Sequence, residues 1–377
     1  MKSKNDRLGY YQVGWKKFYN KTLALMETYR TGYKLEWIFN DEVYSSIDWS
    51  TPINESLLSI YKRRAIQLRS NYDYLVLYFS GGADSINILH AFIDNDIFLD
   101  EIVMQLPEPA RQQFAVGDTS NGNLYAEIEY SAIPHLNKFK NVLNPNTKVR
   151  YQDFAKPVID LLSKDDWFDT NPMGTNICIS GIGRQIAQVT EKHILELCDK
   201  GLRIGQVLGV DKPLIYFDGI DYYAYFSDVS AMHAPPTGIN QSEVFQNYYY
   251  TEFFYWTPDM PEIVVKQAQE IKRYCDIDDF ARMKMKLSLE RHISEFKSIL
   301  HPIIYPPHVT TGLQTEKPTS NIIRPMDQWF WKTASETVIG NYMSAINHLR
   351  ENTNPDHMIG GSIDNGISAH LSKFYKL

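Results

Sequence analysis

The most informative segment of the chain is Tyr74-Leu75-Val76-Leu77-Tyr78-Phe79-Ser80-Gly81-Gly82-Ala83-Asp84-Ser85. Its first half is a nearly continuous apolar run of strand length, which is typical of a strand buried on both faces of a parallel sheet. The two glycines that follow permit a tight turn in which backbone N–H groups converge without obstruction by side chains. Helical spacing from Ser85 to Ile93 then predicts a helix directly after the turn.

This turn predicts an anion-binding site at the carboxyl end of the strand. A helix N-terminus directs N–H groups and a positive partial charge at the same point. The serine hydroxyls can donate to phosphate oxygens, and the Asp84 carboxylate can hold a magnesium ion. The alternative is an ordinary glycine-rich turn in which an aspartate or serine caps the helix. The candidate binding residues are Ser80, Gly81, Gly82, Ala83, Asp84 and Ser85.

Outward from this segment, strands and helices alternate. Apolar runs predict further strands at residues 101–106 and 203–210, and residues 147–151 are a short strand candidate. Helical spacing predicts helices at residues 123–141 and 177–198. Such alternation predicts an α/β fold built on a parallel sheet.

We expect three regions along the chain. A helical N-terminal segment (residues 1–70) includes predicted helices near residues 15–30 and 57–68. The α/β domain spans residues 71–235, and a mostly helical C-terminal region spans residues 236–377. Helices in that last region are predicted at residues 259–275, 277–298 and 334–351, with a proline-rich break at residues 301–307.

Ser-Gly-Gly-x-Asp-Ser after an apolar strand resembles the PP-loop of the N-type ATP pyrophosphatases, the adenine nucleotide alpha hydrolase-like superfamily. Its members include asparagine, GMP and NAD synthetase domains, tRNA thiolation and lysidine enzymes and, more loosely, phosphoadenylylsulfate reductases. The Gly-Lys-Ser/Thr of a Walker A loop is missing. The resemblance is strong over residues 72–95 and implies a HUP-like parallel sheet to about residue 230. The tyrosine- and asparagine-rich style also resembles virus-encoded PP-loop proteins.

The resemblance implies an AMP-forming reaction with ATP and Mg²⁺ as cofactors. In such enzymes the loop binds the β,γ-phosphates, a substrate oxygen attacks the α-phosphorus, and pyrophosphate leaves. An amine, ammonia or a sulfur donor then displaces AMP from the adenylated carbonyl or carboxylate. By position, residues 80–85 would bind pyrophosphate and Asp84 would bind the metal, with adenine near Met104 and Gln105. Met1 is followed by Lys2, so a glutaminase nucleophile is missing and ammonia or sulfur would come free or from a partner chain. Such enzymes are often homodimers.

Two further places are secondary candidates for catalysis. Asp211 and Lys212 follow the strand predicted at residues 203–210, hence on the same sheet edge as the loop. Lys212 would meet the α-phosphate and Asp211 would help to hold magnesium; the alternative is a polar turn before Pro213. Arg184, near the start of a predicted helix, would clamp a phosphate or carboxylate, or would instead pair with a surface carboxylate.

Aromatic residues make up 13% of the chain and cluster at residues 221–226 and 248–256. These rings either pack in the core or line a groove for a flat substrate such as a nucleobase. We expect residues 216–256 and the C-terminal helices to select a small-molecule or nucleobase substrate.

Two other functions are weighed against the AMP-forming enzyme. A phosphoadenylylsulfate-reductase-like enzyme needs a redox cysteine near the C-terminus, and none follows Cys275. A non-catalytic ATP-binding subunit is disfavoured because the loop retains Asp84 and its serines. Cys178 is a candidate sulfur carrier, but its apolar neighbours favour burial.

Composition excludes several classes of protein. With 44% hydrophobic and 22% charged residues, the 377-residue chain is globular rather than fibrous or disordered. A formal net charge of −7 disfavours strong binding to duplex nucleic acid. Three widely spaced cysteines cannot form a disulfide framework, and no apolar segment is long enough for a signal peptide or a membrane span. These features predict a cytoplasmic protein without a membrane partner.

Overall fold

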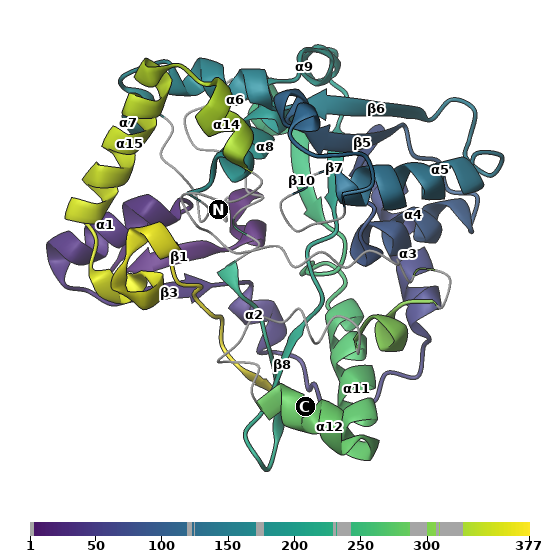
Figure 1. Ribbon diagram of the computed structural model, residues 1–377. Coiled ribbons are helices and arrows are strands. Elements are labelled where there is room, and N and C mark those ends of the chain that lie inside the picture. The colour runs from purple at the N-terminus through teal and green to yellow at the C-terminus, as the bar shows by residue number, and fades with distance from the viewer. Residues whose placement is uncertain are drawn as a thin grey trace.

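The computed structural model describes residues 4–118, 123, 125–170, 177–228, 231, 243–286, 300–306, 309 and 327–377. At its centre lies a five-stranded sheet in which every pair of neighbouring strands is parallel (Figure 1). The strands are β4 (Tyr74–Tyr78), β5 (Glu101–Leu106), β6 (Lys148–Asp153), β7 (Ile204–Leu208) and β10 (Tyr249–Phe253). The predicted α/β class is confirmed, and β4, β5, β6 and β7 lie where the sequence predicted strands.

The order of the strands in this sheet is β10-β7-β4-β5-β6. From β4 the chain proceeds outward through β5 to β6, and it then returns to add β7 and β10 on the other side of β4. The direction of winding therefore reverses between β4 and β7. In open α/β sheets, a crevice for ligands forms outside the carboxyl ends of the two strands at such a reversal.

Both faces of the sheet are covered. Leu75 and Leu77 of β4 belong to the large core, which also includes residues of helices α3, α4 and α11. Val76 points to the opposite face and packs in a smaller cluster with Val189 of α8, Ile194 of α9 and Phe245 of α10. This double burial explains why β4 is apolar along its whole length.

Helices make up much of the remaining described chain. They are α1 (Lys21–Thr31), α2 (Asp41–Tyr44), α3 (Leu57–Asn71), α4 (Ala83–Ile93), α5 (Ile133–Lys138), α6 (Ala155–Leu162), α7 (Trp167–Thr170), α8 (Ile179–Thr190), α9 (Lys192–Asp199), α10 (Glu243–Tyr248), α11 (Glu262–Ile277), α12 (Asp279–Lys286), α14 (Gln328–Thr333) and α15 (Glu336–Glu351). A π-helical turn, η3 (Ile128–Ala132), leads into α5, and the 3₁₀ helices are η1 (Lys4–Leu8), η2 (Glu108–Gln112), η7 (Pro355–His357), η8 (Ile359–Gly361) and η9 (Ile363–Asn365). Of the helix predicted at residues 277–298, the part after residue 286 lies outside the described residues.

The expectation of a helical N-terminal segment is wrong for part of it. Strands β1 (Tyr10–Val13), β2 (Lys16–Phe18) and β3 (Leu35–Ile38) form an antiparallel sheet in the order β2-β1-β3. The first predicted helix begins only at Lys21, because Asn20 accepts the backbone N–H of Leu23 and caps α1.

Two other expectations need revision. The single helix predicted at residues 177–198 is two helices, because Glu191 adopts an extended conformation between α8 and α9. The region after residue 235 is not only helical. It supplies β10 to the central sheet and β11 (Tyr375–Lys376) to an antiparallel sheet with β8 (Leu214–Phe217) and β9 (Tyr222–Tyr225), in the order β11-β9-β8.

N-terminal and C-terminal segments of the chain pack against each other. Figure 1 shows the purple elements α1, β1 and β3 next to yellow C-terminal segments. An aromatic cluster joins them, in which Phe226 packs against Tyr44 and Trp256, and Tyr375 stacks on Trp49. In the described ranges, no helix has both the length and the apolar character required to cross a membrane.

Candidate active site

The turn after β4 depends on the conformation of Gly81. Its φ of +78° lies in the left-handed region, which glycine adopts without steric cost. The π-helical turn η3 packs directly against it: a Cβ on Gly81 would lie 2.6 Å from the backbone nitrogen of Ala132. The Ser131 hydroxyl also donates to the Gly81 carbonyl at 2.6 Å. Gly81 is therefore required both by its φ and by the close approach of η3.

Gly82 occupies the N-cap position of α4, with φ −75° and ψ 161°. Because it has no side chain, it leaves the first N–H groups of the helix without the usual side-chain cap. The hydroxyls of the loop order the turn: Ser80 Oγ accepts the Gly82 N–H at 3.2 Å, and Ser85 Oγ donates to the Gly82 carbonyl at 3.0 Å. The N-terminus of α4 therefore lacks a side-chain cap from its first residue, and the exposed Ser80 lies beside it, an arrangement that can bind an anion.

The end of β7 brings Lys212 and Asp211 to this loop. Lys212 Nζ lies 3.1 and 3.2 Å from the two carboxylate oxygens of Asp84 and 2.7 Å from Asp211 Oδ1. Gly209 permits this approach, since a Cβ on it would lie only 3.2 Å from the Asp84 Cβ. The structure thus brings together three residues predicted from two separate segments, at the reversal point between β4 and β7.

Lys212 and Asp84 stabilise each other's charged forms. Burial disfavours the ammonium of Lys212, whose side chain is 4% exposed, but Asp211 and Asp84 raise its pKa above the ordinary value. Burial likewise opposes ionisation of Asp84, yet the charge of Lys212, with His301 and the Tyr305 hydroxyl, lowers the Asp84 pKa. Lys212 and Asp84 therefore form an ion pair near neutral pH.

Two tyrosines that sequence analysis did not identify also contact Asp84. The Tyr305 hydroxyl donates to Asp84 Oδ1, and the Tyr255 hydroxyl donates to the Asp84 backbone carbonyl at 2.9 Å. Tyr255 lies just after β10 in a segment that was noticed only for its aromatic content. Tyr305 lies in the proline-rich break, where no local pattern indicates a site.

Arg184 lies elsewhere on the same sheet edge. Its guanidinium is 5.7 Å from the centre of the Phe154 ring, and its backbone carbonyl accepts from the Gln105 side chain at 3.2 Å. Phe154 and Gln105 belong to the ends of β6 and β5, whereas Asp84 and Lys212 follow β4 and β7. The Gln105 amide also donates to Gln152 at 2.7 Å. The roles of Arg184 as a clamp and of Met104 and Gln105 as neighbours of adenine stay predictions.

The donor set fits Mg²⁺ bound together with a polyphosphate. Proteins usually hold this ion with one or two carboxylates, and phosphate oxygens and water complete the octahedron. Asp84 and Asp211 can supply the carboxylates, and the N-terminus of α4 can bind phosphate. In the part of the chain that the structure describes, no group of three or more His, Cys, Asp or Glu residues is arranged to hold a metal without such a ligand.

Most of the clustered aromatic rings are buried and are not an open stacking surface. Tyr222, Tyr225, Tyr249 and Trp256 are all below 5% exposed. Cys178 is buried as well, as its apolar neighbours predicted. Its sulfur accepts the Gly181 N–H at the start of α8. Substrate selection by these tyrosines and a sulfur-carrier role for Cys178 are therefore both disfavoured.

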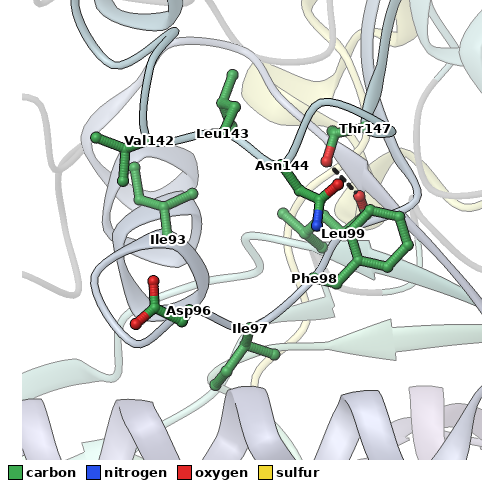
Figure 2. Close-up of a pocket in the computed structure, with 9 residues that line it drawn as sticks. All are labelled: Ile93, Asp96, Ile97, Phe98, Leu99, Val142, Leu143, Asn144 and Thr147. Atoms are coloured by element: carbon green, nitrogen blue, oxygen red, sulfur yellow. Dashed lines mark hydrogen bonds between the residues drawn. The ribbon is translucent and has the colours of Figure 1, made fainter.

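A small cavity of about 150 Å³ lies at the opposite edge of the sheet. Figure 2 shows that its lining comes from residues 93–99, before β5, and residues 142–147, before β6. Because these segments precede their strands, the cavity opens at the amino edge. It is separate from the Asp84 cluster at the carboxyl edge.

No protein-family model matches this chain, and comparison with curated proteins finds no match. The chemistry of the site is accordingly inferred from its own residues and geometry.

Proposed function

We propose that the protein is a Mg²⁺-dependent, AMP- and pyrophosphate-forming enzyme with a PP-loop type of nucleotide site. One observation carries the proposal: Asp84 and Lys212 meet at the reversal point of a parallel sheet, directly beside an uncapped helix N-terminus. The N-terminus of α4 and the loop hydroxyls would bind the β,γ-phosphates. Asp84, with Asp211, would hold Mg²⁺.

Lys212 has the position expected of a group that stabilises charge on the reacting phosphates. When a substrate carbonyl or carboxylate oxygen attacks the α-phosphorus, the bond to the bridging oxygen breaks and negative charge grows on pyrophosphate. A buried cation and helix N–H groups stabilise that charge without reorganisation. An amine, ammonia or sulfur nucleophile would then displace AMP from the adenylated carbon. The substrate would be a small molecule or nucleobase, and the nucleophile would come free or from a partner chain.

Isothermal titration with a non-hydrolysable ATP analogue tests the nucleotide site. We expect binding by the wild type that strengthens with Mg²⁺, and at least a tenfold loss of the Mg²⁺-dependent affinity in Asp84→Ala, because the substitution removes the metal-binding carboxylate. Asp165→Ala is the matched control, since it removes an exposed carboxylate after α6. A wild-type protein that does not bind the analogue would contradict the proposal.

Turnover is tested separately, by screening carbonyl and carboxylate acceptors for release of AMP and pyrophosphate. Pyrophosphate release that requires an acceptor would support the enzyme. Binding of MgATP without release for any acceptor would favour an ATP-binding subunit instead.

A further inference from the structure

Asp84 is held at two different atoms by two buried tyrosines from the C-terminal third of the chain. The Tyr305 hydroxyl donates to carboxylate oxygen Oδ1, and the Tyr255 hydroxyl donates to the backbone carbonyl at 2.9 Å. Tyr255 is fully buried and Tyr305 is 4% exposed. Side chain and backbone of a single residue are therefore both bonded from outside its own helix.

The two phenols form part of one ordered network. Asn87, one turn further along α4, donates its amide to the Tyr255 hydroxyl at 2.8 Å. The Tyr255 and Tyr305 rings lie 5.8 Å apart, and Tyr61 packs on Tyr255 from α3. The Tyr61 hydroxyl in turn donates to the carbonyl of Ile304, beside Tyr305, at 2.8 Å. Buried and hydrogen-bonded phenols have little freedom to reorient, so Asp84 is held in one conformation.

The arrangement leaves part of the Asp84 carboxylate accessible. Its side chain is 27% exposed, although Tyr305 donates to Oδ1 and Lys212 Nζ lies 3.1 Å from Oδ1 and 3.2 Å from Oδ2. An ionised carboxylate accepts about four hydrogen bonds or metal contacts, so these three contacts leave room for a metal ion. Carboxylates that ligate metals are commonly oriented by such hydrogen bonds, and loss of the donor typically lowers metal affinity ~10–100-fold.

We propose that Tyr305 and Tyr255 are positioning residues that hold the Asp84 carboxylate for Mg²⁺, which makes the C-terminal third of the chain part of the metal site. This inference rests on the proposed function. Tyr305 acts on the carboxylate directly, and Tyr255 fixes the backbone from which it projects. In the competing role, Tyr305 inhibits metal binding, because its hydroxyl occupies a carboxylate oxygen that the metal needs.

The test is a Mg²⁺ titration of ATP-analogue binding in Tyr305→Phe and Tyr255→Phe. We expect Mg²⁺-supported affinity to fall roughly 10–100-fold in Tyr305→Phe, and less in Tyr255→Phe, while analogue binding without Mg²⁺ changes little. Tyr342→Phe is the matched control, because it also removes a fully buried hydroxyl, one that donates to the backbone carbonyl of Ile177 and not to Asp84. Tighter Mg²⁺ binding in Tyr305→Phe would show that the Tyr305 hydroxyl inhibits metal binding, and it would overturn the proposal.

The pH profile separates positioning from a structural role. Loss of the Tyr305 donor raises the Asp84 pKa, so Mg²⁺-supported binding should fail at a higher pH in Tyr305→Phe than in the wild type. Lys212 and His301, whose charges also lower the Asp84 pKa, are the same in both proteins, and so is Asp211. A purely structural role would weaken binding with and without Mg²⁺ equally and leave the profile in place.

These outcomes distinguish the two proposals. If the wild type binds MgATP, Asp84→Ala does not, and Tyr305→Phe behaves like Tyr342→Phe, then the positioning role is overturned and the proposed function stands. If the wild type does not bind the analogue at all, both fall. A double-mutant cycle of Tyr305→Phe with Asp84→Asn, measured by urea unfolding, then shows whether the hydrogen bond only stabilises the fold.

Discussion

The two glycines of the loop after β4 occupy different backbone conformations, and they should tolerate substitution differently. Gly81 lies at φ +78°, where an L-residue is strained, and a Cβ on it would clash with the backbone of η3. Gly82 lies at φ −75°, which any residue adopts, and the nearest atom to its missing Cβ is Ser80 Oγ at 3.3 Å. The neighbouring glycines therefore provide a matched pair.

We expect Gly81→Ala to lower the free energy of unfolding by about 2 kcal/mol or more, from left-handed strain of ~1–2 kcal/mol together with the clash against Ala132. Gly82→Ala should change it by less than about 1 kcal/mol. Urea unfolding of both variants measures the difference. Equal losses would show that the turn is not constrained as the backbone angles indicate.

At the scale of elements, a buried ion pair joins α1 to the end of β9 and to the C-terminal segment. Lys21 Nζ lies 2.5 Å from Asp228 Oδ2 and donates to the Ser368 carbonyl at 2.6 Å. The Tyr11 hydroxyl also donates to Asp228, at 2.9 Å. Burial opposes ionisation of Asp228, but the charges of Lys21 and His370 lower its pKa to about 2.

This pair predicts a specific sensitivity to acid. Because the folded-state pKa of Asp228 lies below the value of ~3.9 for an unfolded chain, its stabilisation is present above pH 4 and is lost as pH falls towards 2. The loss should be on the order of 2 kcal/mol. We expect the double variant Lys21→Met/Asp228→Asn, which removes both charges, to lose less stability between pH 5 and pH 2 than the wild type does. Urea unfolding at each pH measures this, and equal acid sensitivity in the two proteins would contradict it.

Over the whole molecule, the C-terminal residues complete a core that begins near the N-terminus. Tyr375 stacks on Trp49 and packs against Tyr44 and Phe226, whereas its neighbour Phe374 is 42% exposed. The backbone N–H of Leu377 also donates to the Tyr222 carbonyl at 2.9 Å, which ties the chain end to β9. The two ends of the chain therefore stabilise each other.

We expect Tyr375→Ala to lower the free energy of unfolding by about 3–5 kcal/mol, as for other large buried aromatics. Phe374→Ala removes a side chain that is 42% exposed and stacks on Tyr225, and it should cost less, about 1–2 kcal/mol. Chemical denaturation of the two variants is the measurement. A small effect of Tyr375→Ala would mean that the C-terminal strand is not part of the cooperative core.

The local sequence predicted those elements whose conformation depends on a short segment of the chain. An apolar run of five or six residues is enough to predict β4 and β5, because burial on both faces requires it. Gly81-Gly82 before a helical pattern is enough to predict the turn, since few residues other than glycine adopt the φ of Gly81. Strand β2 was missed because it lies within the helical spacing of residues 15–30, and β1 and β3 were missed because each is only four residues long.

Tertiary structure alone determined which of these parts meet. The order β10-β7-β4-β5-β6 places residue 212 beside residue 84, although 128 positions separate them. Tyr255 and Tyr305, which are 171 and 221 positions from Asp84, reach it only because β10 joins the sheet and the C-terminal region folds back over it. Contacts over such separations depend on which strands become neighbours and how helices pack on them. No periodicity within a segment encodes that choice, since the free energy that selects it is distributed over the whole core.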